Sequence, residues 1–270
     1  MAGILNIQFK PVLENKTLNL KRVEKFIEEN SDKNLDLVVM PEFFSTGIHH
    51  ESFINSPENE SGAETIAYLS ELAQKYRINI VCGTVIEKSG ENLYNTSFVL
   101  NRNGEIVAKY RKIHLYNYMG GKEGEIITSG NQFVTVDLDF AKIGLAICFD
   151  IRYPQQFKKL AQEGVQIIVL PTAWIIPNEI YENTDSKQFA ADMWVSLQRT
   201  RAFDNLVYFV SSNQVGMVNS NMSALGNSMI ISPTTEVLAN AKDEECALFV
   251  DIDLDIVKYY KSVYPIASID

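Results

Sequence analysis

The sequence is poor in the residues that crosslink small extracellular proteins or bind metal ions. Its 270 residues include three cysteines and three histidines. Cys82, Cys148 and Cys246 lie far apart and cannot all pair, so a disulfide framework is excluded and a reducing cytoplasm fits the composition best. The histidines fall at no spacing typical of zinc ligands, and no metal is expected.

Positive charge and long apolar runs are scarce as well. There are 24 Lys and Arg residues against 34 Asp and Glu, a net charge of -10, which repels nucleic-acid phosphates and anionic lipid headgroups. No stretch reaches the roughly 18 to 20 apolar residues of a membrane-spanning helix. Residues 1–9 alternate like a strand and show no secretory signal. We therefore expect a cytoplasmic protein with no nucleic-acid or membrane partner.

Glycine-rich phosphate-binding motifs are also missing. There is no Gly-x-Gly-x-x-Gly turn, and Gly-Gly-Lys at 120–122 lacks the remaining residues of a phosphate loop. No nucleotide cofactor is expected. What the chain does contain, 46% hydrophobic and 21% charged residues, is enough to bury a large core. A chain of this length without a glycine- or serine-rich linker is expected to form a single domain, 1–270.

Apolar runs alternate with helical patterns, which indicates an α/β protein. The turn Asn-Arg-Asn-Gly at 101–104 predicts a hairpin and therefore a mixed sheet. The helix at 15–29 is expected to bury Leu18, Val23, Phe26 and Ile27. Strands are predicted at 4–9, 35–40, 79–87, 96–100, 106–110, 142–147, 166–170, 206–211, 228–232 and 247–252, and helices at 15–29, 64–76, 154–163 and 186–204.

The two halves of the chain share a pattern of strand, helix and a second strand that ends in proline. The first copy ends at Pro41 and the second at Pro171. As a weak internal repeat, this pattern would place two sheets back to back under flanking helices. Chance similarity between β-α-β units is an equally good explanation.

Cys148 occupies a position suited to a nucleophile. It ends the strand at 142–147 and precedes a helix opened by Pro154, so its thiol can project from the sheet edge beside free backbone N–H groups. On this segment alone, a buried and inert cysteine fits equally well.

Two further segments carry charges at strand ends. Glu42 follows a buried strand and a proline, where a raised pKa would suit proton transfer, although a solvated carboxylate is the commoner outcome. The basic segment 109–115 offers cations, Lys112 among them, that could stabilise a thiolate or an oxyanion. A solvated basic surface would produce the same pattern.

Taken together, these motifs resemble the nitrilase (carbon–nitrogen hydrolase) superfamily. The three that carry the resemblance are Pro-Glu-Phe-Phe at 41–44, Tyr-Arg-Lys-Ile-His-Leu at 110–115 and Ile-Cys-Phe-Asp-Ile-Arg-Tyr-Pro at 147–154, in the order and spacing of that family. Leu-Pro-Thr-Ala-Trp at 170–174, the segment 194–216 and Gly-Asn-Ser at 226–228 extend it over nearly the whole chain.

The resemblance implies a four-layer αββα sandwich and a set of site residues. It makes Glu42 the general base, Lys112 the oxyanion-stabilising cation and Cys148 the nucleophile, with the Phe149 backbone N–H completing the oxyanion site. A second glutamate lies between the lysine and the cysteine in that family. Counting back from Gly130 assigns it to Glu123, with Glu125 as the fallback; Trp174 is a candidate pocket residue, or equally a core tryptophan.

The resemblance further implies an amidase that forms a cysteine acyl-thioester and releases ammonia from a small linear amide, with ω-amides of keto acids favoured. Cys-Phe-Asp-Ile-Arg at 148–152 looks like the amidase version of the motif, so ureido-acid and nitrile hydrolysis rank lower. Ser129, Asp204 and the segment 233–236 depart from the family pattern and weaken the choice of branch. The family also implies a homodimer formed through the helices at 153–163 and 186–204.

Two different classes of protein are also compatible with these residues. One is a Cys–His hydrolase in which His114 or His50 activates the cysteine. The other is a non-catalytic binding protein that retains the fold. The presence of all four candidate residues favours an enzyme over a degenerate site.

Overall fold

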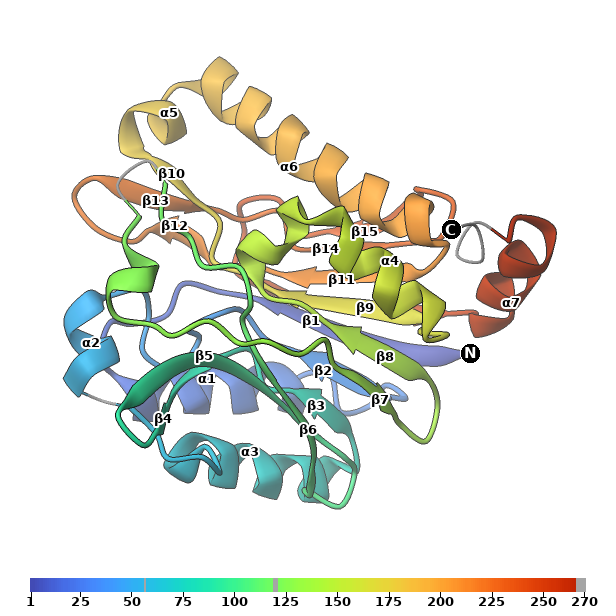
Figure 1. The fold of residues 1–270 in the computed structure, drawn as a ribbon, viewed down its shortest axis with the longest axis horizontal. Coiled ribbons are helices and arrows are strands. Elements are labelled where there is room, and N and C mark those ends of the chain that lie inside the picture. Colours follow the sequence, from blue (N-terminus) through green and yellow to red (C-terminus); the bar gives the residue numbers. More distant parts are fainter. Residues whose placement is uncertain (56, 119–120, 266–270) are drawn as a thin grey trace.

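The computed structural model describes residues 1–55, 57–118 and 121–265, and two large mixed sheets dominate it (Figure 1). The first sheet has seven strands in the order β16-β1-β2-β3-β5-β4, with β6 also paired to β5. Its strands are β1 (Ala2–Gln8), β2 (Leu37–Val39), β3 (Asn79–Val81), β4 (Val85–Ser89), β5 (Asn92–Leu100), β6 (Ile106–Arg111) and β16 (Cys246–Ile252).

The second sheet has six strands in the order β15-β14-β11-β9-β8-β7, and a three-stranded sheet, β10-β13-β12, lies apart from it. The six are β7 (Thr135–Asp137), β8 (Lys142–Leu145), β9 (Ile167–Pro171), β11 (Tyr208–Ser212), β14 (Met229–Ile231) and β15 (Val237–Asn240). The small sheet contains β10 (Ile175–Pro177), β12 (Val215–Met217) and β13 (Met222–Leu225).

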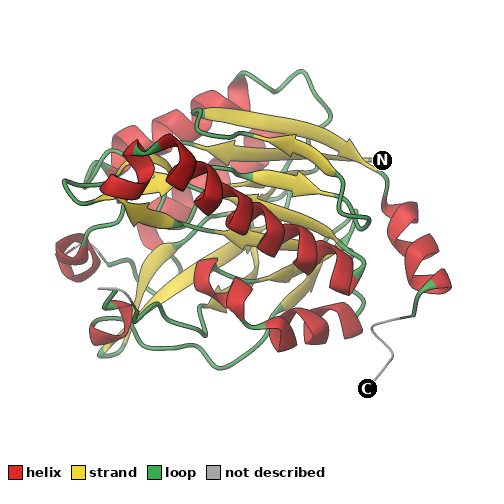
Figure 2. Ribbon diagram, turned by 90° about the horizontal axis from the view of Figure 1, so that it is seen from above, coloured by secondary structure: helices red, strands yellow, loops and turns green. Residues whose placement is uncertain are grey.

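Helices cover the outer face of each large sheet (Figures 1 and 2). α1 (Lys16–Glu28) and α3 (Ala63–Tyr76) pack on the first sheet, and α4 (Pro154–Gln162) and α6 (Thr184–Asn205) on the second. The shorter elements are α2 (His50–Asn55), α5 (Asn178–Glu182), α7 (Leu254–Val263) and the 3-10 turns η1 (Glu123–Glu125) and η2 (Cys148–Arg152).

Successive side chains of the central strands face opposite sides of the sheet, which explains how the layers pack. In β2, Leu37 and Val39 face the core between the two sheets, whereas Val38 faces the core under α1 and α3. In β9, Val169 faces the inter-sheet core and Ile168 faces α4 and α6. Strands buried on both faces are apolar throughout because each face meets a different layer. The predicted four-layer αββα sandwich is confirmed.

The two β-α-β units occupy equivalent places in the two sheets. β1, α1 and β2 form a parallel unit in the first sheet, and β8, α4 and β9 form one in the second. Just beyond β2, the Glu42 backbone N–H donates to the Thr172 carbonyl at 3.3 Å, so the two proline-terminated strand ends meet. This meeting point lies beside the candidate site.

The buried face of the first helix differs from the prediction at two positions: Leu18 is exposed, and Phe26 is half-buried and packs against the edge of the core. Leu18 is 41% exposed, and the buried positions are Asn19, Leu20, Val23 and Ile27. The side-chain amide of Asn19 donates to the carbonyls of Val12 and Ser45 at 2.8 Å each. These bonds turn a polar residue inward, which an apolar pattern cannot reveal.

The predicted strand 79–87 is wrong as a single element. It is broken into β3 and β4, which pair with successive parts of β5. Gly83 lies in the break with φ +48°, and a Cβ there would lie 2.2 Å from the Pro41 carbonyl oxygen. Thr84 Oγ1 in the same break accepts a hydrogen bond from the Phe43 backbone N–H at 2.9 Å. The interruption therefore supports the chain on both sides of Glu42.

None of the helices in the described ranges combines the length and apolar character that crossing a bilayer would demand.

Candidate active site

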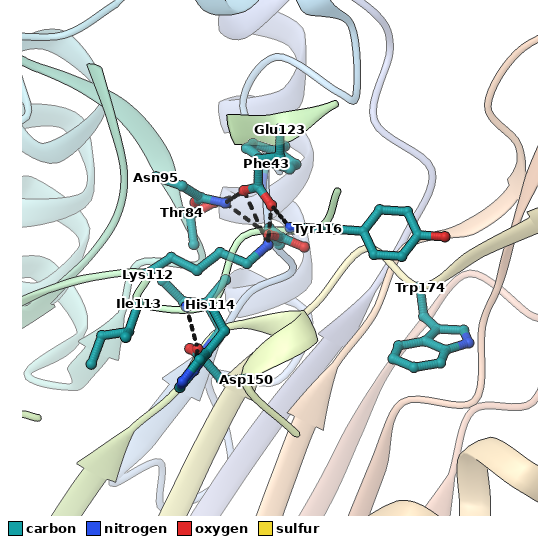
Figure 3. Close-up of polar contacts among 12 residues, drawn as sticks. Phe43, Thr84, Asn95, Lys112, Ile113, His114, Tyr116, Glu123, Asp150 and Trp174 are labelled. Atoms are coloured by element: carbon teal, nitrogen blue, oxygen red, sulfur yellow. Dashed lines mark hydrogen bonds and ion pairs between the residues drawn. The ribbon is translucent and has the colours of Figure 1, made fainter. Parts of the chain in front are cut away.

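Four polar side chains meet inside the protein, and Figure 3 labels three of them, Asn95, Lys112 and Glu123. Glu42 follows β2, Lys112 follows β6 directly, and Asn95 lies in β5, while Glu123 comes from η1. Glu42 is 1% exposed and Lys112 is 2% exposed. Charged side chains are almost never buried so completely unless they are paired, so the pairing here is the central feature of the site.

The Lys112 ammonium lies between two carboxylates. Its Nζ donates to Glu42 Oε1 at 2.9 Å and to Glu123 Oε1 and Oε2 at 3.0 and 2.8 Å. Glu123 Oε2 also accepts from the Tyr116 backbone N–H at 2.8 Å. The fallback candidate, Glu125, instead pairs with the exposed Lys122 at 3.3 Å. The structure thus brings Glu123, and not Glu125, to the lysine.

Asn95 completes this cluster. Its side-chain NH₂ donates to Glu42 Oε1 at 2.8 Å and to Glu123 Oε1 at 3.0 Å, and its backbone carbonyl accepts from the Lys112 backbone N–H at 2.9 Å. The sequence motifs did not predict this residue, because a single asparagine in a strand belongs to no motif. Asn95 also lies one residue before the predicted strand 96–100, so no signal in the sequence indicated it.

Cys148 begins η2, where β8 gives way to α4. Its backbone has φ +45°, a conformation that non-glycine residues rarely adopt and that is often retained at functional sites. The Asp150 carboxylate holds this turn by accepting from the Ile147 backbone N–H at 2.8 Å, the Tyr110 hydroxyl at 2.7 Å and the His114 backbone N–H at 3.0 Å. Asp150 therefore ties the cysteine turn to the residues on both sides of Lys112.

His114 was considered as a possible partner for the cysteine. Its Nδ1 lies 2.7 Å from Asp150 Oδ1, and its ring stacks on Tyr153 with a centroid separation of 3.5 Å. These contacts place His114 in the support of the turn, and none of them joins its ring to Cys148. The side chain of His50 lies outside the described residues.

Burial and charge set the protonation states of the cluster. Burial raises the pKa of Glu42 and the Glu123 charge adds to it, while Lys112 opposes both. Burial also raises the pKa of the Cys148 thiol, helped by Glu42 and opposed by Lys112. Burial alone would lower the pKa of Lys112, but Glu123 and Glu42 hold it well above its ordinary value. The three side chains thus lie close enough to influence one another, and the thiol stays protonated at neutral pH unless a base acts on it.

Hydrogen bonds from both halves of the chain hold the backbone around Glu42 in place. The Gln214 side-chain amide donates to the Glu42 carbonyl at 2.7 Å. Phe43, the next residue, has φ +53° and is anchored to Thr84 through its backbone N–H. This strained, doubly anchored segment presents the Glu42 carboxylate to the cluster.

Aromatic rings line one side of the site. Tyr116 and Tyr118 pack against Phe149 with centroid separations of 5.3 and 5.5 Å. The candidate pocket residue Trp174 is half-buried, and it stacks on the core residue Trp194 with a centroid separation of 4.6 Å. Trp174 therefore has one face in the core and part of its surface open.

A comparison with protein families identifies the family of this chain. Residues 6–262 match the family described as carbon-nitrogen hydrolase. The chain belongs to the carbon–nitrogen hydrolase family. The family predicted from the motifs is therefore confirmed.

Named relatives agree with this assignment over most of their length. The hydrolase is 32% identical over 256 residues to human Omega-amidase NIT2, covering 93% of this chain and 88% of the relative. It is 31% identical to the chloroplastic Omega-amidase of Arabidopsis thaliana, covering 94% and 69% respectively. Among solved structures, Saccharomyces cerevisiae Nit3, a member of branch 10 of the nitrilase superfamily, superposes with a TM-score of 0.85 at 27% identity, covering 98% of this chain and 94% of that one.

The cluster gives the hydrolase the parts that acyl transfer requires. A thiol, a carboxylate with a raised pKa and an ammonium lie together, and such groups can supply a nucleophile, a proton acceptor and a charge that stabilises an oxyanion. In the described part of the chain, no group of three or more His, Cys, Asp and Glu side chains is arranged to hold a metal ion.

Proposed function

We propose that this hydrolase cleaves the terminal amide of a small linear acid, with the ω-amides of keto acids as preferred substrates, and releases ammonia. Cys148 is the nucleophile and Glu42 the general base, while Lys112 stabilises the oxyanion. The observation that carries the proposal is the burial of Glu42, Lys112 and Glu123 in one hydrogen-bonded group whose charges reach the Cys148 thiol.

The reaction proceeds in two stages. Glu42 accepts the thiol proton, and the Cys148 thiolate attacks the amide carbon. The Lys112 ammonium and the Phe149 backbone N–H hold the resulting oxyanion, and one such donor contributes about 3 to 4 kcal/mol to barrier lowering. Collapse breaks the carbon–nitrogen bond, and ammonia leaves with the proton held by Glu42. Glu42 then takes a proton from water, whose oxygen attacks the thioester carbon. The carbon–sulfur bond breaks, the acid is released, and the proton on Glu42 returns to the Cys148 sulfur.

Arg152 supports the choice of an acidic substrate. It is exposed, its guanidinium lies 5.8 Å from the Trp174 ring centroid, and its charge acts on the half-buried Tyr116. Within the described residues it forms no ion pair with a carboxylate. A guanidinium beside the aromatic wall can bind a substrate carboxylate through two parallel hydrogen bonds. The names of the relatives, omega-amidases, agree with such a substrate.

The proposal is tested by ammonium release together with trapping of the acyl-enzyme. We expect release from keto-acid ω-amides, and intact-protein mass spectrometry should place the acyl adduct on Cys148 and on neither Cys82 nor Cys246. Product from ureido acids or nitriles alone would overturn the substrate assignment. An active Cys148→Ala variant would overturn the mechanism.

The role of Arg152 has its own test. Arg152→Gln should raise KM for an acidic amide about 10- to 100-fold, because a hydrogen-bonded ion pair is lost, and leave KM for a neutral amide of similar size nearly unchanged. Arg77→Gln is the matched control, since Arg77 is also exposed and lies at the end of α3, outside the cluster. Equal loss for both amides would contradict carboxylate recognition.

We propose further that the enzyme acts in the cytoplasm, where a catalytic thiol stays reduced, and that it forms a homodimer through α4 and α6. Exposed apolar side chains on α6 support the dimer. Phe189, Met193 and Phe203 are 66%, 51% and 50% exposed and recur at helical spacing along one stripe.

A further inference from the structure

We propose that Asn95 is a positioning residue that determines which oxygen of Glu42 exchanges a proton with Cys148 and that favours the ionised form of Glu42. This inference rests on the proposed function, since it refines the role of Glu42 in it. In this role the Asn95 amide does more than fill space, because it influences the protonation of Glu42.

The two carboxylate oxygens of Glu42 have different hydrogen-bond partners. Oε1 accepts two hydrogen bonds, from Asn95 Nδ2 at 2.8 Å and from Lys112 Nζ at 2.9 Å. Two donors on one carboxylate oxygen disfavour a proton on that atom. Oε2 is therefore the oxygen that takes and returns the proton of the Cys148 thiol, whose interaction with Glu42 lowers the pKa of the carboxyl.

The two carboxylates set the orientation of the Asn95 amide. Both hydrogens of the Asn95 NH₂ are directed at carboxylate oxygens, Glu42 Oε1 and Glu123 Oε1. The opposite orientation would set the amide oxygen against two oxygens that carry negative charge. The side chain therefore has one stable orientation between these carboxylates, and in that orientation its hydrogen bond favours the ionised form of Glu42.

The two ends of the Asn95 amide differ in their hydrogen bonding. Asn95 is fully buried, and its Oδ1 has no hydrogen-bond partner among the described residues. Ser97 Oγ, two residues along the same strand, is likewise unpartnered within the described part of the chain. A buried amide with only a structural role would be expected to have both ends satisfied. Here only the nitrogen end is used, and both of its side-chain contacts are with the candidate catalytic carboxylates.

The consequence is a measurable effect on proton transfer. Burial and Glu123 raise the pKa of Glu42, whereas Lys112 lowers it. A hydrogen bond from the Asn95 amide favours the charged carboxylate, so it acts in the same direction as Lys112. Removing the donor makes ionisation of Glu42 harder. The base form then appears only at higher pH, and less of it is present near neutrality.

The experiment follows the pH dependence of Cys148 alkylation by iodoacetamide, which needs no knowledge of the substrate, together with kcat and KM for an active amide. Asn95→Leu should move the acid limb of both profiles upward by about one pH unit, because a hydrogen bond to the charged form is lost. Asn95→Asp should move the limb further by adding negative charge. Asn95→Ser, which retains a hydroxyl donor, should show a smaller upward shift than Asn95→Leu. The loss should fall on kcat, about tenfold or more at neutral pH, with KM little changed.

Ser97→Ala is the matched control, because it removes a buried polar atom from the same face of β5 and should leave the acid limb in place. An unshifted limb in Asn95→Leu would overturn the inference, and if that variant fails to fold, Asn95→Ser and Asn95→Asp decide by the same criterion. Failure of the proposed function is distinguishable. In that case Glu42→Gln would leave wild-type alkylation kinetics unchanged, whereas an error about Asn95 alone leaves the Glu42→Gln effect intact.

Discussion

At the scale of single residues, the site is governed by an imbalance of buried charge. Two carboxylates, Glu42 and Glu123, share the single ammonium of Lys112, and all three side chains are buried. One negative charge is left over when both glutamates are ionised. Since burial penalises that charge, the carboxylate group accepts a proton more readily than an exposed one would. This tendency suits a residue that must take a proton from a thiol.

The raised pKa of Glu42 predicts the acid limb of the activity profile. In the proposed mechanism Glu42 must be ionised to accept the thiol proton, so we expect activity to be lost as pH falls through the pKa of Glu42. Because that pKa lies above the ordinary 4.5, the loss begins at higher pH than for an exposed carboxylate. The dependence of kcat/KM on pH measures this limb. Glu42→Gln should lower kcat/KM by about 10²- to 10⁴-fold, whereas Glu125→Gln should leave the profile unchanged.

The same excess of negative charge predicts opposite changes in stability for substitutions at Lys112 and at Glu42. Lys112→Met leaves two carboxylates without their counter-ion and should lower the free energy of unfolding by about 3 to 5 kcal/mol. Glu42→Gln removes the excess charge and should be neutral or stabilising. The pKa of Lys112 is raised, so its contribution is fully present below the unfolded lysine pKa and persists at neutral pH.

Urea unfolding at neutral pH measures both effects. Lys122→Met, at an exposed lysine paired with Glu125, is the control and should change stability little. If Lys112→Met were as stable as the wild type, the buried ion group would not stabilise the fold.

At the scale of elements, the break between β3 and β4 shows what a pattern along the chain can and cannot reveal. Residues 79–87 resemble one strand because their apolar residues run through Cys82. The interruption depends on the carbonyl of Pro41, which arrives from another strand and leaves no room for a side chain at Gly83. Contacts of this kind lie outside any local signal.

Gly83→Ala tests the importance of the break. Its positive φ and the approach of the Pro41 carbonyl at 2.2 Å both oppose a Cβ, so we expect a loss of stability of about 1 to 3 kcal/mol and reduced kcat as the Glu42 segment shifts. Thermal unfolding and steady-state kinetics measure the two effects. Gly90→Ala is the control, with φ +59° and no atom within 4 Å of the added Cβ. It should lose some stability and keep kcat; equal kcat loss would contradict a local effect.

Long elements were predictable because their signals are local. The helix predicted at 15–29 appears as α1, and the Asn15 side chain caps it by accepting from the Leu18 backbone N–H at 3.1 Å. Short strands such as β7, β10 and β12, three residues each, were missed. Their hydrogen bonds come from partners outside the strand itself, and three residues are too few to show a period.

The site residues divide in the same way. Glu42, Lys112 and Cys148 stand at strand ends within recognisable motifs, so their types and order could be found from the sequence. Their distances could not, because those depend on how the two sheets pack. Asn95 and Gln214 support the cluster through hydrogen bonds that only the folded chain creates, and buried amides carry no motif of their own.

At the scale of the whole molecule, the exposed stripe on α6 leads to a prediction about assembly. The double variant Phe189→Glu and Met193→Glu should convert the proposed homodimer to a monomer, because buried unpaired carboxylates oppose association. Light scattering at micromolar concentration measures this. Tyr259→Glu on α7, at a side chain 61% exposed, is the control and should leave the mass unchanged. A monomeric wild-type protein would refute the dimer.

The hydrogen bond between Glu42 and Thr172 joins strand ends from the two halves of the chain, and it has a consequence for how the protein comes into being. Glu42, Asn95 and Lys112 belong to the first sheet, while Cys148 belongs to the second. In the proposed mechanism, neither half alone can activate the sulfur. A chain in which the two sheets have not yet packed together would carry an ordinary thiol, so the chemistry requires the assembled sandwich.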